Sequence, residues 1–330
     1  MPINREAPPL EITVVICTRD RAAQLALVLR SAAAMAIPDG LAWELCVVDN
    51  GSSDNTREVV EGFRSVLPVR CVREEAAGLS HARNRGVAEA AGRYICWTDD
   101  DVEIDPDWLA AYAAAFRRHP EAAIFGGRIL PKLEANGPAW FSAMADRWPL
   151  TTVLARRDFG DAVIPLTLEG GRTPWGANFA VRAAEQRHCA YDPNLGVSPR
   201  QKRLGEEAEV IFQIMQAGGT GWWVPDAKVR HIIPLRRQSR SYLREYFSAS
   251  GETLAYLEHA APGVNHMSVS PAARAPAHFG RLRLSAQMAL ARTLYGACRL
   301  LGANLRSLYY LRRLAVLEGV QAYRRRARPS

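Results

Sequence analysis

Three consecutive carboxylates, Asp99, Asp100 and Asp101, follow directly on an apolar run of the chain, "RYICWT". Adjacent like charges repel one another, and no lysine or arginine stands beside them in sequence. Such a cluster at the end of a buried strand can hold a hard divalent cation, which prefers oxygen ligands and can neutralise a leaving diphosphate. The alternative is a solvated acidic turn continued by Glu103 and Asp105, because acids are common before helices.

The segments around the triplet alternate between strand-like and helix-like patterns. Short apolar, β-branched runs predict strands at Ile12–Cys17, Trp43–Asp49, Val69–Glu74 and Arg93–Thr98. The runs between them have helical spacing and strong helix formers. Strands that are apolar on both faces, each followed by a helix, predict an α/β fold with a mostly parallel sheet flanked by helices. Ligands of such sheets bind beyond the carboxyl ends of the strands.

The second half of the chain is less regular. Its pattern predicts strands at Ala122–Leu130 and Gly176–Arg182, a helix ending at Gly218, a strand pair in Gly221–Pro234 broken at Pro225, and a helix over Ser239–Glu258. Residues 261–280 have linker composition. We therefore expect a catalytic domain at 1–260, a linker at 261–280 and a basic amphipathic helical tail at 281–330.

Composition limits the class of protein. The 330 residues are 48% hydrophobic, which supports a sizeable core, and the six cysteines form no CxxC pair, as expected of free thiols in a reducing compartment. The N-terminus has no apolar signal core, and no uncharged apolar run reaches the roughly 18 residues of a membrane span. We expect a cytoplasmic location.

The net charge is +8, yet Pro271–Ser330 holds twelve arginines and one acid, which leaves −3 on the first 270 residues.

Seven stretches between Glu11 and His231 carry a resemblance to a known family. They read "VVICTRDR", "CVVDNGSSDNT", "GLSHARNRG", "YICWTDDDVEIDPDWL", "WGANFAVR", "GEEAEVIFQIMQAGG" and "VPDAKVRH". In this order they resemble the family-2 glycosyltransferases, which have the Rossmann-like GT-A fold. The resemblance implies a nucleotide-diphosphate sugar as donor, with UDP expected, a divalent metal, Mn²⁺ or Mg²⁺, and transfer of one sugar to an acceptor hydroxyl.

The resemblance also implies which residues hold the nucleotide. Thr18 and Arg19 would flank the base, and Asp49 would accept a hydrogen bond from a nucleobase N–H or a ribose hydroxyl. The family usually has a second acid where this chain has Asn50, so only Asp49 is carried over. The other polar residues of the turn that follows Asp49 are explained as helix-capping residues. The segment with Gly78 and Arg83 would lie under the pyrophosphate, and a guanidinium suits phosphate geometry; a basic helix start is the alternative.

By resemblance, the triplet is a DxD-type motif. Asp101 is our first choice for direct contact with the metal, and Asp99 is a second candidate ligand. Asp99 or Asp100 would approach the ribose or a metal-bound water. His231 matches a histidine that, in several related enzymes, is a further metal ligand or touches the diphosphate. A histidine that merely packs after a strand is the alternative.

Inverting transfer needs a carboxylate that takes the proton of the acceptor hydroxyl. In the family this base comes from a Glu-Asp pair that opens a helix, and here the pair is Glu206-Glu207. Glu207 aligns with the usual base, and Glu206 is the second candidate. The alternative is that both acids stand there only because acids are favoured at a helix N-terminus. Trp140 and Trp175 are candidates for acceptor contact because they stand in irregular segments.

Other classes of protein fit less well. A nucleotidyltransferase usually has a glycine-rich phosphate loop after the first strand, where this chain reads "CTRDRAAQL". A processive polysaccharide synthase would need membrane spans and a QxxRW motif. A noncatalytic nucleotide-sugar-binding scaffold at the membrane would not need intact carboxylates. The expected acceptor is a glycan or a lipid-linked saccharide of surface polysaccharide or glycolipid assembly, with no nucleic acid as partner.

The basic tail predicts two helices that lie on an anionic membrane surface, on the inner face of the cell membrane. The apolar positions that recur at helical spacing are Leu284, Met288, Ala291, Leu294 and Tyr295, and then Leu305, Leu308, Tyr309, Leu311 and Leu314. Arginines punctuate both segments, as in helices that lie in a bilayer interface. Packing of these helices on the catalytic domain, or a dimer interface, is the alternative.

Overall fold

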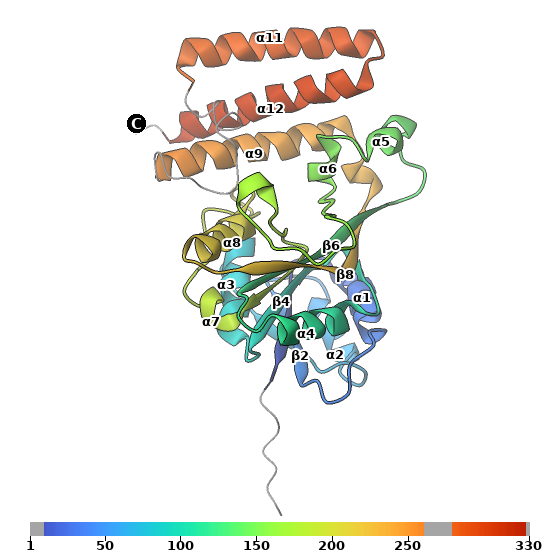
Figure 1. Cartoon of the computed structure of the whole chain (residues 1–330). Coiled ribbons are helices and arrows are strands. Elements are labelled where there is room, and N and C mark those ends of the chain that lie inside the picture. The colour runs from blue at the N-terminus through green and yellow to red at the C-terminus, as the bar shows by residue number, and fades with distance from the viewer. Residues whose placement is uncertain (1–9, 261–278, 328–330) are drawn as a thin grey trace, which may run out of the picture.

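The computed structural model describes residues 10–260 and 279–327, which form an α/β fold around one mixed sheet (Figure 1). The strands lie in the order β3-β2-β1-β4-β7-β6-β8-β5. Their bounds are β1 Ile12–Thr18, β2 Trp43–Asp49, β3 Val69–Arg73, β4 Tyr94–Asp99, β5 Val102–Ile104, β6 Ile124–Leu133, β7 Asn178–Arg182 and β8 Gly221–Ile233. Strands β1 to β4 pair in parallel, as do β6 and β8, whereas β7 and β5 run antiparallel to their neighbours. The expected mostly parallel sheet is confirmed.

Helices cover both faces of the sheet because its central strands are apolar on both sides. In β1, Val14 and Ile16 pack in one core cluster with α1, α2 and α4, while Val15 packs in a second cluster with α3 and α8. The helix bounds are α1 Ala22–Ala33, α2 Thr56–Gly62, α3 Leu79–Glu89, α4 Trp108–Arg118, α7 Ala183–Gln186 and α8 Glu206–Gln216. Successive side chains of a strand point to opposite faces of the sheet. A continuous apolar run therefore supplies apolar side chains to both core clusters.

The segment Gly221–Ile233 is one strand, and the strand pair broken at Pro225 that the sequence indicates is wrong. The register between β6 and β8 shifts just before Arg128, so that Pro225 falls in an irregularity of the ladder. Asn178 spans this place, because its Nδ2 donates to Arg128 O at 2.9 Å and to Ala227 O at 2.8 Å. A bulge accommodates a proline, which has no N–H to give to the ladder, without ending the strand.

A helical layer lies beyond the sheet (Figure 1). It consists of α5 Ala139–Met144, α6 Leu150–Val153, α9 Arg240–Ala260, α11 Arg281–Leu300 and α12 Asn304–Arg326, with short 3₁₀ turns at η1 Glu169–Gly171 and η2 Leu235–Arg237. The backbones of α9 and α12 touch through two glycines. A Cβ added to Gly251 would lie 2.1 Å from Val316 O, and one added to Gly319 would lie 2.0 Å from Ser248 O. Helix α12 is therefore packed closely on the rest of the chain.

This packing corrects the expected apolar faces of the tail. Leu284 and Ala291 of α11 are buried in the protein, and so are Leu308, Leu311 and Leu314 of α12. These positions were expected to face a membrane. Leu284, Leu308 and Leu311 pack instead in core clusters with α9, whereas the expected positions Leu305 and Tyr309 are exposed. None of the helices in the described ranges is long and apolar enough to cross a bilayer. Of the expected linker, residues 261–278 lie outside the described residues.

Candidate active site

The carboxylate triplet stands at the carboxyl end of β4, where two arginines from distant segments contact Asp100 and Asp101. Arg21, between β1 and α1, donates from Nη1 to Asp100 Oδ1 at 2.6 Å and from Nη2 to Asp101 Oδ2 at 3.0 Å. Arg237, in η2, places its Nη2 at 3.0 Å from the same Asp101 Oδ2. The fold thus brings two guanidinium groups to Asp100 and Asp101, although no basic residue stands beside the triplet in sequence.

The three carboxyls differ in their environment. Burial raises the pKa of Asp100 to about 7, with the charge of Asp101 adding to the rise, although Arg21 and the Thr18 hydroxyl at 2.7 Å oppose it. Burial also acts to raise the pKa of Asp101, but His231, Arg237 and Arg21 together outweigh it and hold that pKa well below its usual range. The Asp99 side chain is 36% exposed. Asp101 is thus the member whose ionised form is favoured most, and Asp99 is the member most open to solvent.

His231 on β8 directs its ring at Asp101. Its Nε2 is 3.5 Å from Asp101 Oδ1, and its Nδ1 is 3.2 Å from Leu154 O. A backbone carbonyl at Nδ1 fixes that nitrogen as the donor, which is how metal-binding histidines are usually oriented. Arg237 Nη1 lies 3.1 Å from the same Nε2.

Asp101 and His231 are the side chains here that would hold Mn²⁺ or Mg²⁺, as two ligands of a larger set. Asp101 offers a carboxylate oxygen and His231 an imidazole nitrogen within 3.5 Å of each other. The described residues contain no cluster of three or more His, Cys, Asp or Glu side chains that could enclose a metal. The remaining ligands would therefore be oxygens of a diphosphate and of water, which Mg²⁺ commonly retains.

Arg83, on α3, is an internal cation beneath the triplet. Its guanidinium is 5.6 Å from the centre of the Trp97 ring and 5.5 Å from that of Tyr191, and it lies 3.6 Å from both Asp99 Oδ1 and Glu206 Oε1. Its buried Nη1 has no hydrogen-bond partner among the described residues. Arg83 therefore connects Asp99 of the triplet with Glu206 at the start of α8.

Glu206 and Glu207 open α8, where the helix dipole favours acids. The preceding Gly205 has φ of 91°, a left-handed conformation that glycine adopts readily. Burial and the neighbouring Glu207 charge raise the pKa of Glu206 to about 8, although Arg83 opposes the rise. The Glu207 carboxyl lies close to the Gly176 backbone, since a Cβ atom added to Gly176 would be 3.1 Å from Glu207 Oε1. The pair is thus divided into a buried, largely protonated acid and a less buried carboxyl beside a glycine backbone.

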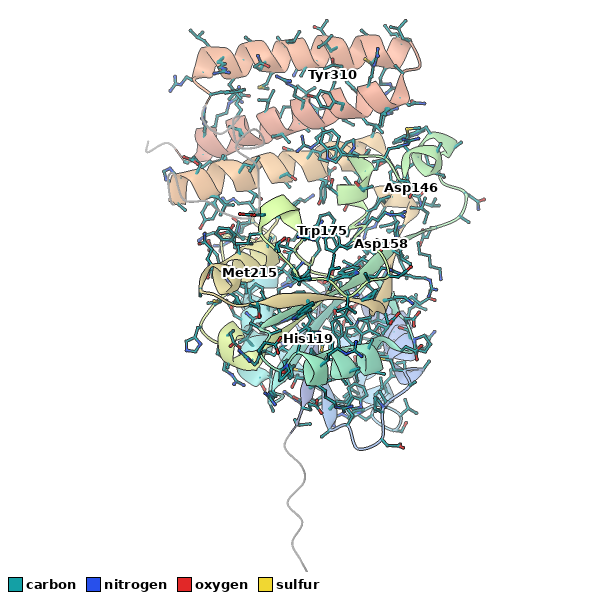
Figure 2. All side chains as sticks on the ribbon, in the orientation of Figure 1. His119, Asp146, Asp158, Trp175, Met215 and Tyr310 are labelled. Atoms are coloured by element: carbon teal, nitrogen blue, oxygen red, sulfur yellow. The ribbon has the colours of Figure 1, made fainter. Side chains whose placement is uncertain are left out.

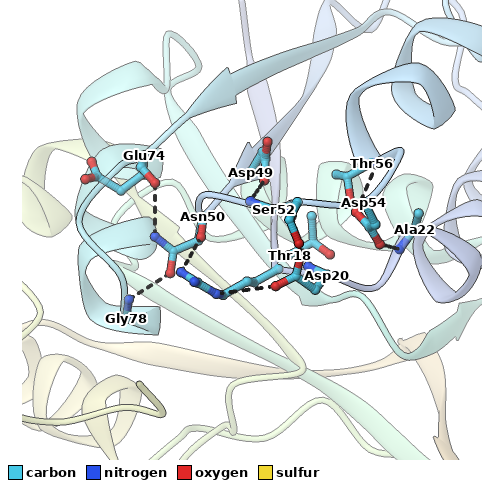
Figure 3. A network of polar contacts seen from close by, with 12 residues as sticks. Thr18, Asp20, Ala22, Asp49, Asn50, Ser52, Asp54, Thr56, Glu74 and Gly78 are labelled. Atoms are coloured by element: carbon cyan, nitrogen blue, oxygen red, sulfur yellow. Dashed lines mark hydrogen bonds and ion pairs between the residues drawn. The ribbon is translucent and has the colours of Figure 1, made fainter. Parts of the chain in front are cut away.

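A second polar cluster joins the ends of β1 and β2 (Figure 3). Thr18 links it to the triplet, since its carbonyl accepts from Asn50 N at 2.9 Å and its hydroxyl donates to Asp100. Asn50 Nδ2 donates to two backbone carbonyls of the loop before α3, at 3.2 and 2.7 Å, and its Oδ1 accepts from Gly78 N at 2.8 Å. Gly78 has φ of 145°, which favours glycine. Asn50 therefore clamps the loop with amide donors that a second acid would lack.

Asp49 and Arg19 differ in accessibility within this cluster. Asp49 is buried, accepts from Ser52 N at 2.8 Å and lies 3.2 Å from Arg73 Nη1. The Arg19 side chain is 39% exposed and donates to Asn50 O at 2.8 Å. Arg19 is thus the more accessible of the two, whereas Asp49 already holds the turn after β2.

The two tryptophans expected on the acceptor side lie in separate core clusters. The Arg157 guanidinium lies 4.5 Å from the Trp175 ring centre, and that of Arg240 lies 4.4 Å from the Trp140 ring centre. Figure 2 shows Trp175 between the sheet and the C-terminal helices. Trp175 directly precedes Gly176 and is therefore near Glu207. Trp140 packs with the helical layer.

Arg21 is the residue of this cluster that the sequence analysis missed. The signal for it was present, because Arg21 closes the stretch "VVICTRDR" and follows the same strand as Thr18. A parallel sheet with β1 beside β4 brings the residues after β1 next to the triplet. Strand order was the missing information, since it cannot be deduced from the residue types alone.

Comparison with known proteins identifies the family. Residues 13–170 match the model of Glycosyl transferase family 2. The succinoglycan biosynthesis protein ExoM of Rhizobium meliloti (strain 1021) is 30% identical over 249 residues, which are 74% of each chain. The chain belongs to glycosyl transferase family 2. A second relative of this glycosyltransferase is the glucosyl-dolichyl phosphate glucuronosyltransferase of Haloferax volcanii, 24% identical over 230 residues, which cover 68% of this chain and 70% of that protein.

Solved structures show that this family 2 glycosyltransferase has the GT-A fold. The mannosyltransferase PcManGT from Pyrobaculum calidifontis, in complex with GDP-Man and Mn²⁺, superposes with a TM-score of 0.63 at 15% identity, over 98% of this chain and 91% of that one. S. aureus TarS 1-349 in complex with UDP-GlcNAc superposes with a TM-score of 0.54 at 16% identity, over 97% and 93%. The fold expected from the sequence is confirmed.

Proposed function

We propose that this glycosyltransferase transfers a single sugar from a nucleotide-diphosphate sugar, with UDP expected, to an acceptor hydroxyl with inversion at the anomeric carbon. The observation that supports the proposal is the convergence of separate segments beyond the carboxyl ends of the strands. Asp101, in the turn after β4, contacts His231 from β8 and Arg237 from η2, and Asp99 at the end of β4 contacts Arg83, which also contacts Glu206 from α8. This edge of the sheet is where ligands of such folds bind.

On the donor side, two arginines and one metal-binding carboxylate would stabilise the leaving nucleotide diphosphate. Arg21 and Arg237 carry the positive charge nearest the triplet, and both are held by Asp101 Oδ2 at 3.0 Å. Donor phosphates would compete with Asp101 for these guanidinium groups. A divalent metal held by Asp101 and His231 would neutralise the charge that develops on the departing diphosphate. Thr18, Arg19, Asp49, Gly78 and Arg83 are proposed to surround the nucleotide.

On the acceptor side, Glu207 is proposed as the general base. Its carboxylate takes the proton of the acceptor hydroxyl while the hydroxyl oxygen attacks the anomeric carbon. The bond between that carbon and the diphosphate oxygen breaks on the opposite face, and its electron pair leaves with the nucleotide diphosphate. Glu206 is less suited to this role, because its pKa of about 8 keeps it largely protonated at neutral pH. Trp175, beside Gly176, is proposed to contact the acceptor, and Trp140 is a more distant candidate.

The proposed acceptor is a glycan or a lipid-linked saccharide in surface polysaccharide or glycolipid assembly. The similarity to ExoM, which is named a succinoglycan biosynthesis protein, supports polysaccharide assembly. We place the enzyme on the cytoplasmic face of the membrane, with residues 1–260 as the catalytic domain and the tail, residues 281–330, in contact with anionic lipid. The excess of arginine over acid in the tail supports this location.

The test is release of nucleotide diphosphate from a panel of UDP- and GDP-sugars, with Mn²⁺, with Mg²⁺ and with EDTA. We expect release with at least one donor, loss of release in EDTA, and a product of inverted anomeric configuration by NMR. Glu207→Gln should abolish transfer and still bind nucleotide diphosphate. A product of retained configuration, or full activity of Glu207→Gln, would overturn the mechanism. Full release in EDTA would overturn the metal requirement.

A further inference from the structure

The side of α11 that faces away from α12 forms an apolar stripe with no protein partner among the described residues. Figure 1 shows α11 as the outermost helix, separated from the sheet by α12 and α9. Its buried positions, Leu284 and Ala291, face inward. The opposite side is the α11 outer face, and its members, all exposed, are Leu282, Ala286, Ala289, Leu290, Thr293, Ala297, Leu300 and, just past the helix, Leu301. Leu282 and Leu300 are 89% and 91% exposed.

The spacing of these residues makes the stripe continuous. Steps of three and four residues from Leu282 to Leu300 keep the side chains on one line along an α-helix. Large exposed leucines at both ends of one helix face are unusual for a surface in water, where contiguous apolar patches mark interaction sites. The stripe therefore calls for a partner that is apolar over the full length of α11.

The charges on either side of the stripe indicate what that partner is. Exposed arginines border it at Arg281, Arg283, Arg292 and Arg299, and the sequence of α11 contains no acid. The one acid of the tail, Glu318, is used inside the protein, since its carboxylate binds Arg244 at 2.6 and 2.9 Å and lies 3.6 Å from Arg292. An apolar helix face bordered by arginines fits the interface of a bilayer that contains anionic lipids.

We infer that the α11 outer face is the surface by which this protein docks on an anionic lipid bilayer. This inference deepens the membrane part of the proposed function, and it replaces the buried positions expected from the sequence by a different face of the same helix. A second copy of the chain fits less well. Antiparallel pairing of two α11 helices would bring Arg281 of one copy near Arg299 of the other, and like charges at such close range repel.

Helices α12 and α9 connect the docking helix to the active site. Helix α12, which carries α11, receives a hydrogen bond from Arg240 Nη1 to Ser307 Oγ at 3.1 Å. Arg240 begins α9, three residues after Arg237, whose guanidinium contacts Asp101 at 3.0 Å. A membrane held at α11 would thus have a fixed position relative to the donor site. Such an arrangement suits an acceptor that is anchored in lipid.

The test is co-sedimentation of the full-length chain with vesicles. One set contains phosphatidylglycerol mixed with phosphatidylcholine, and the other contains phosphatidylcholine alone. The variant Leu282→Gln/Leu290→Gln/Leu300→Gln removes the stripe without touching the core. Its matched control is Leu27→Gln/Val66→Gln, at positions 51% and 63% exposed on the catalytic domain. A third protein, Arg281→Gln/Arg299→Gln, removes two flanking charges.

We expect the wild type to bind the phosphatidylglycerol vesicles and not phosphatidylcholine alone. The leucine variant should bind at least about tenfold more weakly, the control should bind like the wild type, and each lost arginine should weaken binding about fivefold at low salt. Equal binding by the leucine variant, or no binding of the wild type at low salt, would overturn the inference. A wild-type dimer in light scattering that the leucine variant converts to a monomer would assign the face to a second copy instead.

Release of nucleotide diphosphate, measured on the same proteins without vesicles, separates this inference from the proposed function. The substituted residues lie outside the active site, so we expect all variants to match the wild type in that assay. Absence of release in every protein, together with the expected pattern of vesicle binding, would refute the proposed donor chemistry and leave the docking surface supported.

Discussion

Replacing each glutamate at the start of α8 by glutamine should separate their roles. Glu206 is 5% exposed, and its pKa of about 8 means that roughly nine tenths of it is protonated at pH 7. A protonated carboxyl and an amide have similar size and both are neutral. We therefore expect Glu206→Gln to keep most of its transferase activity at pH 7. Glu207→Gln removes the proposed base, and we expect it to lose about 10² to 10⁴ in rate.

The same substitution should change how stability depends on pH. An unfolded Glu206 titrates near 4.5 and the folded one near 8, so between these values the folded state binds more protons than the unfolded state. Wild-type stability should therefore fall as pH rises through that window and level off above it. The rise from 4.5 to about 8 corresponds to at most about 5 kcal/mol, because movement of Arg83 toward the ionised carboxylate would reduce the loss.

The assay is thermal unfolding of both proteins from pH 5 to pH 9, together with product formation at pH 7. Glu206→Gln should gain stability relative to the wild type as pH rises, with little difference at pH 5. The surface variant Glu58→Gln, on α2, is the control and should follow the wild type at all pH values. Parallel curves for Glu206→Gln and the wild type would refute the assignment of a neutral Glu206. If Glu206→Gln were inactive and Glu207→Gln active, the general base would be Glu206 and not Glu207.

Three further predictions concern the metal pair, the loop clamp and the helix crossing. Asp101→Asn should weaken Mn²⁺-dependent binding of nucleotide diphosphate at least about tenfold in calorimetry, and unchanged affinity would remove Asp101 from the metal site. Asn50→Asp loses two amide donors and should destabilise the fold by about 1–3 kcal/mol; a melting temperature equal to that of the wild type would contradict the clamp. Gly319→Ala places a methyl group 2.0 Å from Ser248 O and should cost about 1–3 kcal/mol. Its control, Gly296→Ala on α11, has no atom within 4 Å and should not lower the melting temperature, and equal effects of the two would contradict the close crossing.

Local sequence patterns predicted many of the strands and helices of the fold. The apolar, β-branched runs became β1 to β4, because a strand covered by helices on both faces needs side chains that are apolar on both faces. Helices α11 and α12 match the two helices expected from helical spacing. The triplet at the end of β4 and the glutamates at the start of α8 also stand where the sequence put them. All of these depend on residues that are close in the chain.

The sequence by itself therefore determined the elements, the family resemblance and the candidate residues at strand and helix ends. Only the tertiary structure decided which charges meet. Arg21 and Arg237 reach Asp101 because β1 lies beside β4 and because η2 follows β8, and no local pattern contains that strand order. The tail shows the same limit. Helical spacing located its apolar positions, but packing of α11 on α12 decided that Leu284 faces the protein and Leu282 faces outward, because two apolar sides of one helix look alike until a neighbour covers one of them.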